Sequence, residues 1–316
     1  MSAIPRLTET VVVGCDSSWE SQNAVVAAAR EASRRGADLV LLAVAEHRPY
    51  WPDNLAWVTR AETESAQEAQ AAVDRALARA IDTEPAVVVR TAIVQEPDSQ
   101  ELDDVARQVG LLVLGRRGDG GQVAFSLGST SAELGHRFRC PMLVVHDQGR
   151  QSQRRQFGPE RAVVVGMDIH GVAHDVLAVA MNEAVIRDLP LVVVHALPRG
   201  EDADRAAIGE GWRRCREALR GARLPAGVPN RLVITSDDPV PALLHRVGPA
   251  DLLVIGTHGH GRLAGLIAGS VSRAILDKMT CDVLLVQPGV HVSEAIPSAL
   301  AGHSGQSWGT SSDLVP

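Results

Sequence analysis

The sequence contains one glycine motif twice, each time between an apolar run and a helical pattern. In the second copy, Gly256-Thr257-His258-Gly259 is followed after nine residues by Gly269-Ser270. In the first copy, Gly115-Arg116-Arg117-Gly118 is followed after nine residues by Gly128-Ser129, and each position precedes its counterpart by 141 residues. Because the neighbouring apolar runs repeat as well, the chain is expected to be a duplication of whole domains rather than a short-period solenoid.

The motif has the physical properties of a phosphate-binding loop. Glycines let the backbone approach an anion and adopt positive φ, and a following helix N-terminus offers unpaired N–H groups and a favourable dipole. Ser129 and Ser270 would add a hydroxyl in the first turn, either as a helix cap or as a phosphate ligand. Glycines after a strand can instead be tight-turn residues, but matched spacing in two copies favours phosphate binding.

Apolar runs that alternate with helical patterns predict the fold of each copy. The predicted strands are 10–14, 38–44, 86–94, 111–114 and 142–145, then 162–166, 191–196, 231–235, 252–255 and 283–286. The predicted helices are 21–34, 59–81, 98–109 and 129–138, then 173–187, 205–219, 241–247 and one from 270. Near-continuous apolar strands between helices indicate a parallel sheet covered on both faces. The predicted fold class is therefore α/β, with two tandem doubly wound domains, each a five-stranded parallel sheet.

Asp16 and Asp168 follow the first predicted strand of each copy. Doubly wound sheets bind ligands outside the carboxyl ends of their strands, at a topological switch point. The aspartates and the glycine motifs all follow strands, so we expect them on the same edge of each sheet. The alternative role of the aspartates is helix capping, which does not exclude contact with a nucleotide.

The repeat and the local composition predict the domain boundaries. Residues 1–146 form the first domain, and residues 147–159, which contain almost nothing apolar, form a linker. Residues 160–290 form the second domain. The tail, 291–316, is rich in Ser, Gly and Ala without periodicity, and is expected to be disordered.

Composition and charge exclude several classes of function. A net charge of −7 argues against nucleic-acid binding that rests on general electrostatics. No apolar run reaches the length of a membrane span, and the first residues lack a signal-peptide core. The four cysteines show no CxxC or zinc spacing and are interpreted as buried hydrophobes of a cytoplasmic protein.

The other motifs considered assign no catalytic residue and no metal ligand. The chain has no G-x4-G-K-[ST] loop and no G-x-S-x-G elbow, and its glycine motifs do not follow the first strands as a dinucleotide fingerprint should. His170 and His174 have helical i, i+4 spacing but lack a third ligand. Trp51 and Trp57 lie in a predicted loop at 46–57 and are interpreted as packing residues rather than as stacking partners of adenine.

The glycine motif, placed late in an α/β domain whose first strand ends in Asp, resembles the universal stress protein family. More closely, the chain is similar to tandem-domain, ATP-binding members of actinobacteria, over residues 8 to 146 and 160 to 288. The resemblance implies an adenine nucleotide alpha hydrolase-like fold that binds ATP, with Mg²⁺, and shows weak or no turnover. It also implies a nucleotide-dependent regulator of stress or growth state. It further implies dimer formation through the last strand, between two chains or between the two domains of one chain.

Carried over residue by residue, the resemblance implies two sets of nucleotide contacts. The first domain would use Gly14, Asp16, Ser17, Gly115, Arg117, Gly118, Gly128, Ser129 and Thr130. The second domain would use Gly166, Asp168, Gly256, His258, Gly259, Gly269, Ser270 and Val271. The second copy departs from the family pattern at Asp168-Ile169-His170, whereas Asp16-Ser17-Ser18 keeps it. Two other hypotheses are a slow ATPase or phosphotransferase, with Asp16 or Asp168 as base, and a nucleotide-free dimeric scaffold.

Overall fold

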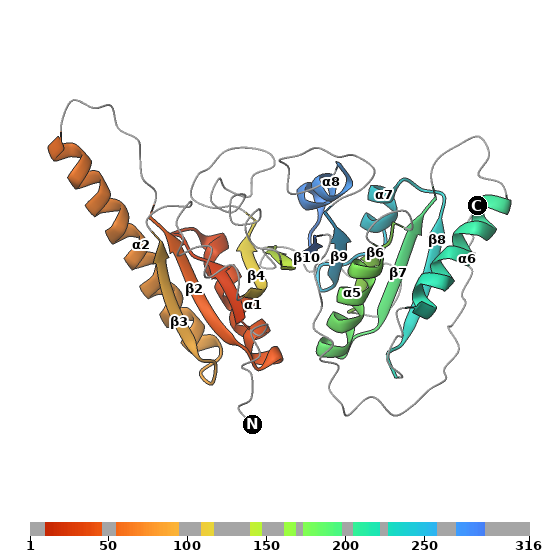
Figure 1. Cartoon of the computed structure of the whole chain (residues 1–316), viewed down its shortest axis with the longest axis horizontal. Coiled ribbons are helices and arrows are strands. Elements are labelled where there is room, and N and C mark those ends of the chain that lie inside the picture. The colour runs from red at the N-terminus through yellow and green to blue at the C-terminus, as the bar shows by residue number, and fades with distance from the viewer. Residues whose placement is uncertain are drawn as a thin grey trace, which may run out of the picture. The chain divides into compact units, whose positions relative to one another are not determined.

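The structure is a computed structural model that describes residues 10–45, 55–94, 109–116, 140–146, 161–168, 173–197, 205–221, 227–257 and 270–287. The chain divides into two units, Met1–His146 and Asp147–Pro316, and each unit contains its own sheet (Figure 1). The predicted linker and tail lie outside the described residues.

Unit 1 is built on five parallel strands in the order β3-β2-β1-β4-β5. The strands are β1 (Thr10–Gly14), β2 (Asp38–Val44), β3 (Val89–Val94), β4 (Val109–Gly115) and β5 (Met142–Val145). Helix α1 (Trp19–Arg35) packs against β1 and β4, and α2 (Leu55–Thr83) packs against β2 and β3.

Unit 2 repeats this arrangement, with parallel strands in the order β8-β7-β6-β9-β10. The strands are β6 (Val163–Gly166), β7 (Leu191–Ala196), β8 (Asn230–Thr235), β9 (Leu252–Gly256) and β10 (Asp282–Val286). The helices are α5 (Ala173–Arg187), α6 (Arg205–Gly221), α7 (Pro239–Leu244) and α8 (Ser270–Lys278). The predicted α/β class with tandem five-stranded parallel sheets is confirmed.

The strands form where the sequence has continuous runs of β-branched and aliphatic residues. Val11, Val12 and Val13 in β1 are at most 1% exposed, and Val163, Val164 and Val165 in β6 are fully buried. Such runs are typical of parallel strands that are covered on both faces. The four cysteines are also buried as free thiols, which confirms their interpretation as small hydrophobes.

The residues that cap helix α1 explain where it begins and ends. Ser18 is its N-cap and accepts a hydrogen bond from the Ser21 amide, and Gly36 ends the helix in the left-handed region with φ of 61°. The helix buries Glu31, which pairs with Arg35 at 2.9 Å. Unit 2 buries Glu183 at the equivalent place in α5, where it pairs with Arg187 at 3.1 Å. The duplication has therefore kept an ion pair between a buried glutamate and a half-buried arginine as well as the sheet.

Two local predictions are wrong. Helix α2 begins at Leu55 rather than at residue 59, so Trp57 lies in a helix and not in the predicted loop. Leu55 and Ala56 are good helix formers, and the neighbouring aromatic residues concealed this in the sequence. Val109, predicted to end a helix, instead begins β4, while the rest of that predicted helix lies outside the described residues.

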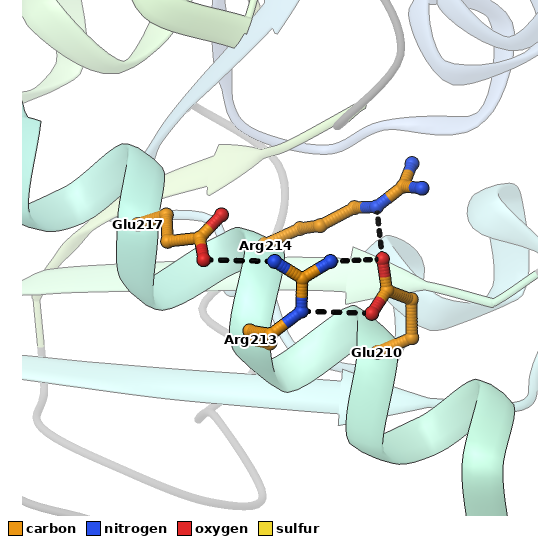
Figure 2. A network of polar contacts seen from close by, with 4 residues as sticks. All are labelled: Glu210, Arg213, Arg214 and Glu217. Atoms are coloured by element: carbon orange, nitrogen blue, oxygen red, sulfur yellow. Dashed lines mark hydrogen bonds and ion pairs between the residues drawn. The ribbon is translucent and has the colours of Figure 1, made fainter.

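The exposed face of α6 carries a network of four charged residues. Figure 2 shows Glu210 between Arg213 and Arg214, with Arg213 also reaching Glu217. Arg213 Nε lies 2.9 Å from a Glu210 oxygen, and Arg214 Nε lies 2.6 Å from the other one. These hydrogen bonds, chiefly that of Arg213, lower the pKa of Glu210 to about 2. Because the four side chains are largely exposed, salt screens the network and it contributes little to stability.

The lowered pKa of Glu210 predicts the acid response of α6. A carboxylate with a depressed pKa stabilises the fold above its unfolded pKa, and this contribution is lost as pH falls through its folded pKa. The loss should lie between the ordinary value of 4.5 and about 2. Carboxyl NMR of Glu210 should show an ionised group at acid pH where an ordinary glutamate is protonated. Arg213→Gln should raise the midpoint, whereas Arg216→Gln, which alters a residue over the Trp212 ring, should not. If Glu210 titrates with the same midpoint in the parent and in Arg213→Gln, the hydrogen bond from Arg213 does not lower its pKa.

Candidate functional site

In unit 1, the loop after β1 is held by a ring of hydrogen bonds that we call the serine network, formed by Asp16, Ser18 and Ser21. Asp16 Oδ1 accepts from the Ser18 amide at 2.9 Å and from the Ser18 hydroxyl. The Ser21 hydroxyl accepts from the Asp16 amide at 3.0 Å, and the Ser18 hydroxyl caps α1 by accepting from the Ser21 amide. The N-cap is therefore Ser18, and Asp16 holds that cap in place while staying half-buried.

The strand order brings Asp16 and Gly115 to one edge of the sheet. β1 pairs with β2 on one side and with β4 on the other. The strand order therefore reverses at β1 and β4, which makes their carboxyl ends the topological switch point of the sheet. An ideal Cβ on Gly115 would lie 2.8 Å from both the backbone carbon and the backbone oxygen of Glu20, in the first turn of α1. Gly115 therefore lets the end of β4 lie directly against the helix that follows Asp16. This close packing is a reason for the glycine that does not involve phosphate.

Arg116 and His146 meet at the ends of β4 and β5. The Arg116 guanidinium lies 2.8 Å from His146 Nε2, and both residues are half-buried. A guanidinium can only donate, so Nε2 must accept and the neutral ring carries its proton on Nδ1. The equivalent position to Arg116 in unit 2 is Thr257, which is buried and whose amide donates to the Val286 carbonyl at 2.9 Å. The strand registers agree here, with Gly115 opposite Val145 and Gly256 opposite Val286. The following side chain is charged in unit 1 and neutral in unit 2.

In unit 2, Met167, the residue before the equivalent aspartate Asp168, is bonded to β7 through both its amide and its carbonyl. The Met167 amide donates to the Val194 carbonyl, and His195 Nδ1 lies 2.9 Å from the Met167 carbonyl oxygen. Asp168 follows and is half-buried. An ideal Cβ on Gly166 would lie 3.0 Å from Leu243 of α7, so this glycine also allows close packing.

Helix α8 begins beside the end of β9. The Ser272 hydroxyl donates to the Gly256 carbonyl at 2.7 Å, which ties the first turn of α8 to the strand end. Ser270 and Val271 begin the helix and are exposed. Exposed groups at a helix N-terminus can contact an anion, as the sequence interpretation requires.

Several predicted contacts lie outside the described residues. They are Arg117, Gly118, Gly128, Ser129, Thr130, His258, Gly259 and Gly269. Trp51 and His170 also lie outside. The structure brings together Gly14, Asp16, Ser17 and Gly115 in unit 1. In unit 2 it pairs the strands that end at Gly166 and Gly256, with Asp168 just beyond the first.

Sequence reasoning missed three supporting residues of these sites. Ser21 lies in the predicted helix, and because a capping box would have Glu or Gln at this position, the sequence offers no signal for its role. His146 and His195 each contact a residue about thirty positions away in sequence, so only strand pairing brings them to their partners. Among the described residues, no group of three metal-ligating side chains occurs, and no helix there is long and apolar enough to cross a membrane.

Two parallel α/β units that each carry a strand-end aspartate and a G-x-x-G-x9-G-S motif define a class of duplicated, doubly wound α/β domains. The model of the Universal stress protein family matches residues 8–146 and 160–287, which is most of the chain. The chain belongs to the universal stress protein family.

Relatives in sequence agree with this assignment. A universal stress protein of Mycolicibacterium smegmatis is 31% identical over 293 residues, which cover 88% of this chain and 97% of that protein. One from Mycobacterium tuberculosis (strain H37Rv) is 30% identical over 294 residues, covering 90% and 98%.

For the fold, a universal stress protein from Archaeoglobus fulgidus has a TM-score of 0.61 at 19% identity, covering 89% of this chain and 99% of that one. A putative universal stress protein from Pseudomonas aeruginosa has a TM-score of 0.54 at 18% identity, covering 89% and 94%.

The close approach of Gly115 to α1 predicts that adding a methyl group there lowers the stability of the chain, whereas the same change at an open helical glycine does not. Gly115→Ala places a methyl group against fixed backbone atoms, and should lower the free energy of unfolding by about 1–3 kcal/mol. Gly209→Ala in α6 is the matched control, because nothing lies within 4 Å of its ideal Cβ and the residue is helical. It should raise stability by up to about 1 kcal/mol. Urea denaturation measures both changes, and a Gly115→Ala chain as stable as its parent would refute the close approach.

Proposed function

We propose that each unit binds ATP, with Mg²⁺, at the carboxyl edge of its sheet, and that the nucleotide sets the state of a cytoplasmic regulator of stress or growth. Family membership and the duplicated glycine motif support the proposal. The observation that carries it is the pairing of β1 with β4, and of β6 with β9, which sets each strand-end aspartate beside the strand that enters the glycine motif. Open parallel sheets bind ligands at this switch point.

The residues present fit a nucleotide. Asp16 is fixed by the serine network yet half-buried, so its carboxylate can be reached by a nucleoside hydroxyl. Ser17 directly precedes the N-cap of α1 and Ser270 begins α8; both are exposed, and hydroxyl and amide groups at such places suit phosphate oxygens. Bound ATP would supply charge and shape that distinguish two states of the chain. The residues of the chain bind and orient, and the proposal assigns no catalytic residue to them.

Dimer formation through the last strand of a unit belongs to the same proposal. β5 and β10 each stand at the end of the strand order of their own unit. Such an end strand has backbone groups that can pair with another strand.

The hydrogen bonds of Asp16 allow its turn role to be separated from a nucleotide role. Asp16→Asn keeps an oxygen that accepts from Ser18, so the N-cap and the stability should stay unchanged. It removes the carboxylate charge, and ATP affinity at unit 1 should fall about tenfold or more, since hydrogen bonds to charged groups contribute roughly 1.5–3 kcal/mol. Asp16→Ala should in addition destabilise the chain by about 1 kcal/mol.

Isothermal titration calorimetry with Mg-ATP and thermal denaturation measure these effects. Asp168→Asn is the matched control, and it should weaken the other site while leaving unit 1 unchanged. If Asp16→Asn binds ATP as its parent does, Asp16 holds only the helix cap and the proposed contact is wrong.

A further inference from the structure

The first residue after β1 and the first residue after β6 make the same backbone hydrogen bond. The Cys15 amide donates to the Leu42 carbonyl at 2.7 Å, and the Met167 amide donates to the Val194 carbonyl at 2.9 Å. The strand registers agree, with Gly14 opposite Leu42 and Gly166 opposite Val194. Asp16 and Asp168 are therefore at equivalent positions, two residues beyond the end of each strand.

The side chains that support these loops differ. In unit 1, Ser18 and Ser21 bond to Asp16 and hold it. At the equivalent positions unit 2 has His170 and Ala173. Alanine has no hydroxyl, so the hydrogen bond that Ser21 makes to the aspartate amide cannot be repeated.

The residue before Asp168 is hydrogen-bonded by a side chain of the neighbouring strand β7. His195 in β7 is 4% exposed, and its Nδ1 lies 2.9 Å from the carbonyl oxygen of Met167, the residue directly before Asp168. A carbonyl can only accept, so Nδ1 carries the proton and donates. The equivalent residue in unit 1 is Ala43, which has no donor.

Packing against α6, in addition to the hydrogen bond to Met167, restricts the position of the His195 ring. Helix α6 has a glycine, Gly211, next to His195, where an ideal Cβ would lie 3.6 Å from Cδ2 of the ring and 2.9 Å from the Leu197 side chain. The imidazole therefore lies between the end of β6 and α6. A buried ring that is hydrogen-bonded through Nδ1 and packed against α6 has few alternative positions, so it can fix the carbonyl that it contacts.

We propose that His195 is a positioning residue of the unit 2 site, which acts through the Met167 carbonyl to hold Asp168. The effect on nucleotide binding rests on the proposed function, whereas the effect on the loop does not. Unit 1 holds the equivalent aspartate, Asp16, through the serine network. The two sites therefore depend on different supporting residues.

Two variants separate the hydrogen bond from side-chain volume. His195→Asn keeps an N–H near the position of Nδ1 in a smaller side chain. His195→Leu keeps apolar volume and loses the donor. If the bond positions the loop, Asn should behave like the parent and Leu should not. If only packing matters, Asn should be the worse of the two.

Hydrogen exchange in the full chain without nucleotide is the first measurement. Amides of the loop at 167 and 168 should exchange about tenfold faster in His195→Leu and close to the parent rate in His195→Asn, as expected for loss of one net hydrogen bond. The amides at residues 15 to 18 in unit 1 should be unchanged in both variants. Exchange in His195→Asn as fast as in His195→Leu, or unchanged exchange in His195→Leu, overturns the inference.

Nitrogen NMR of the imidazole tests the bond itself. The parent should show His195 protonated on Nδ1, and a neutral ring protonated only on Nε2 overturns the inference. With Mg-ATP, His195→Leu should weaken one site about tenfold and His195→Asn should not. A parent that binds no ATP refutes the proposed function, while hydrogen exchange and NMR still decide the role of His195. Faster exchange in His195→Leu with unchanged ATP affinity overturns the link to the nucleotide.

Discussion

Parallel pairing of the first and fourth strands of each unit is the constraint on which the candidate sites depend. Because β1 lies between β2 and β4, the loop after β1 emerges beside the end of β4. Gly115 then allows the end of β4 to approach the first turn of α1. The aspartate, the helix N-terminus and the strand that enters the glycine motif therefore meet at one edge of the sheet.

The two units keep this backbone and change the side chains around it. Asp16 is held by serines on its own loop and helix, whereas the loop of Asp168 is held by an imidazole on the next strand. The ends of the fourth strands differ in the same way, with a half-buried Arg116 in unit 1 and a buried Thr257 in unit 2. If both units bind nucleotide as proposed, these different supports should give two sites of different affinity.

The fold could be predicted from the sequence because its strands are continuous runs of Val, Leu and Ile. The predicted bounds of β1, β2, β5, α5 and β7 agree with the structure. The start of α2 was missed because aromatic residues obscured a helical segment, and α7 begins earlier than predicted because Pro239 and Pro241 are tolerated in a first turn. The contacts of His146 and His195 could not be predicted, since each depends on the register of strands far apart in the chain.

The nucleotide content of freshly purified protein tests the central claim most directly. Nucleotide released by acid and separated by chromatography should be ATP, with one molecule for each unit. A chain that contains no nucleotide, and binds none when Mg-ATP is added, would contradict the account and leave the nucleotide-free scaffold as the function of the fold.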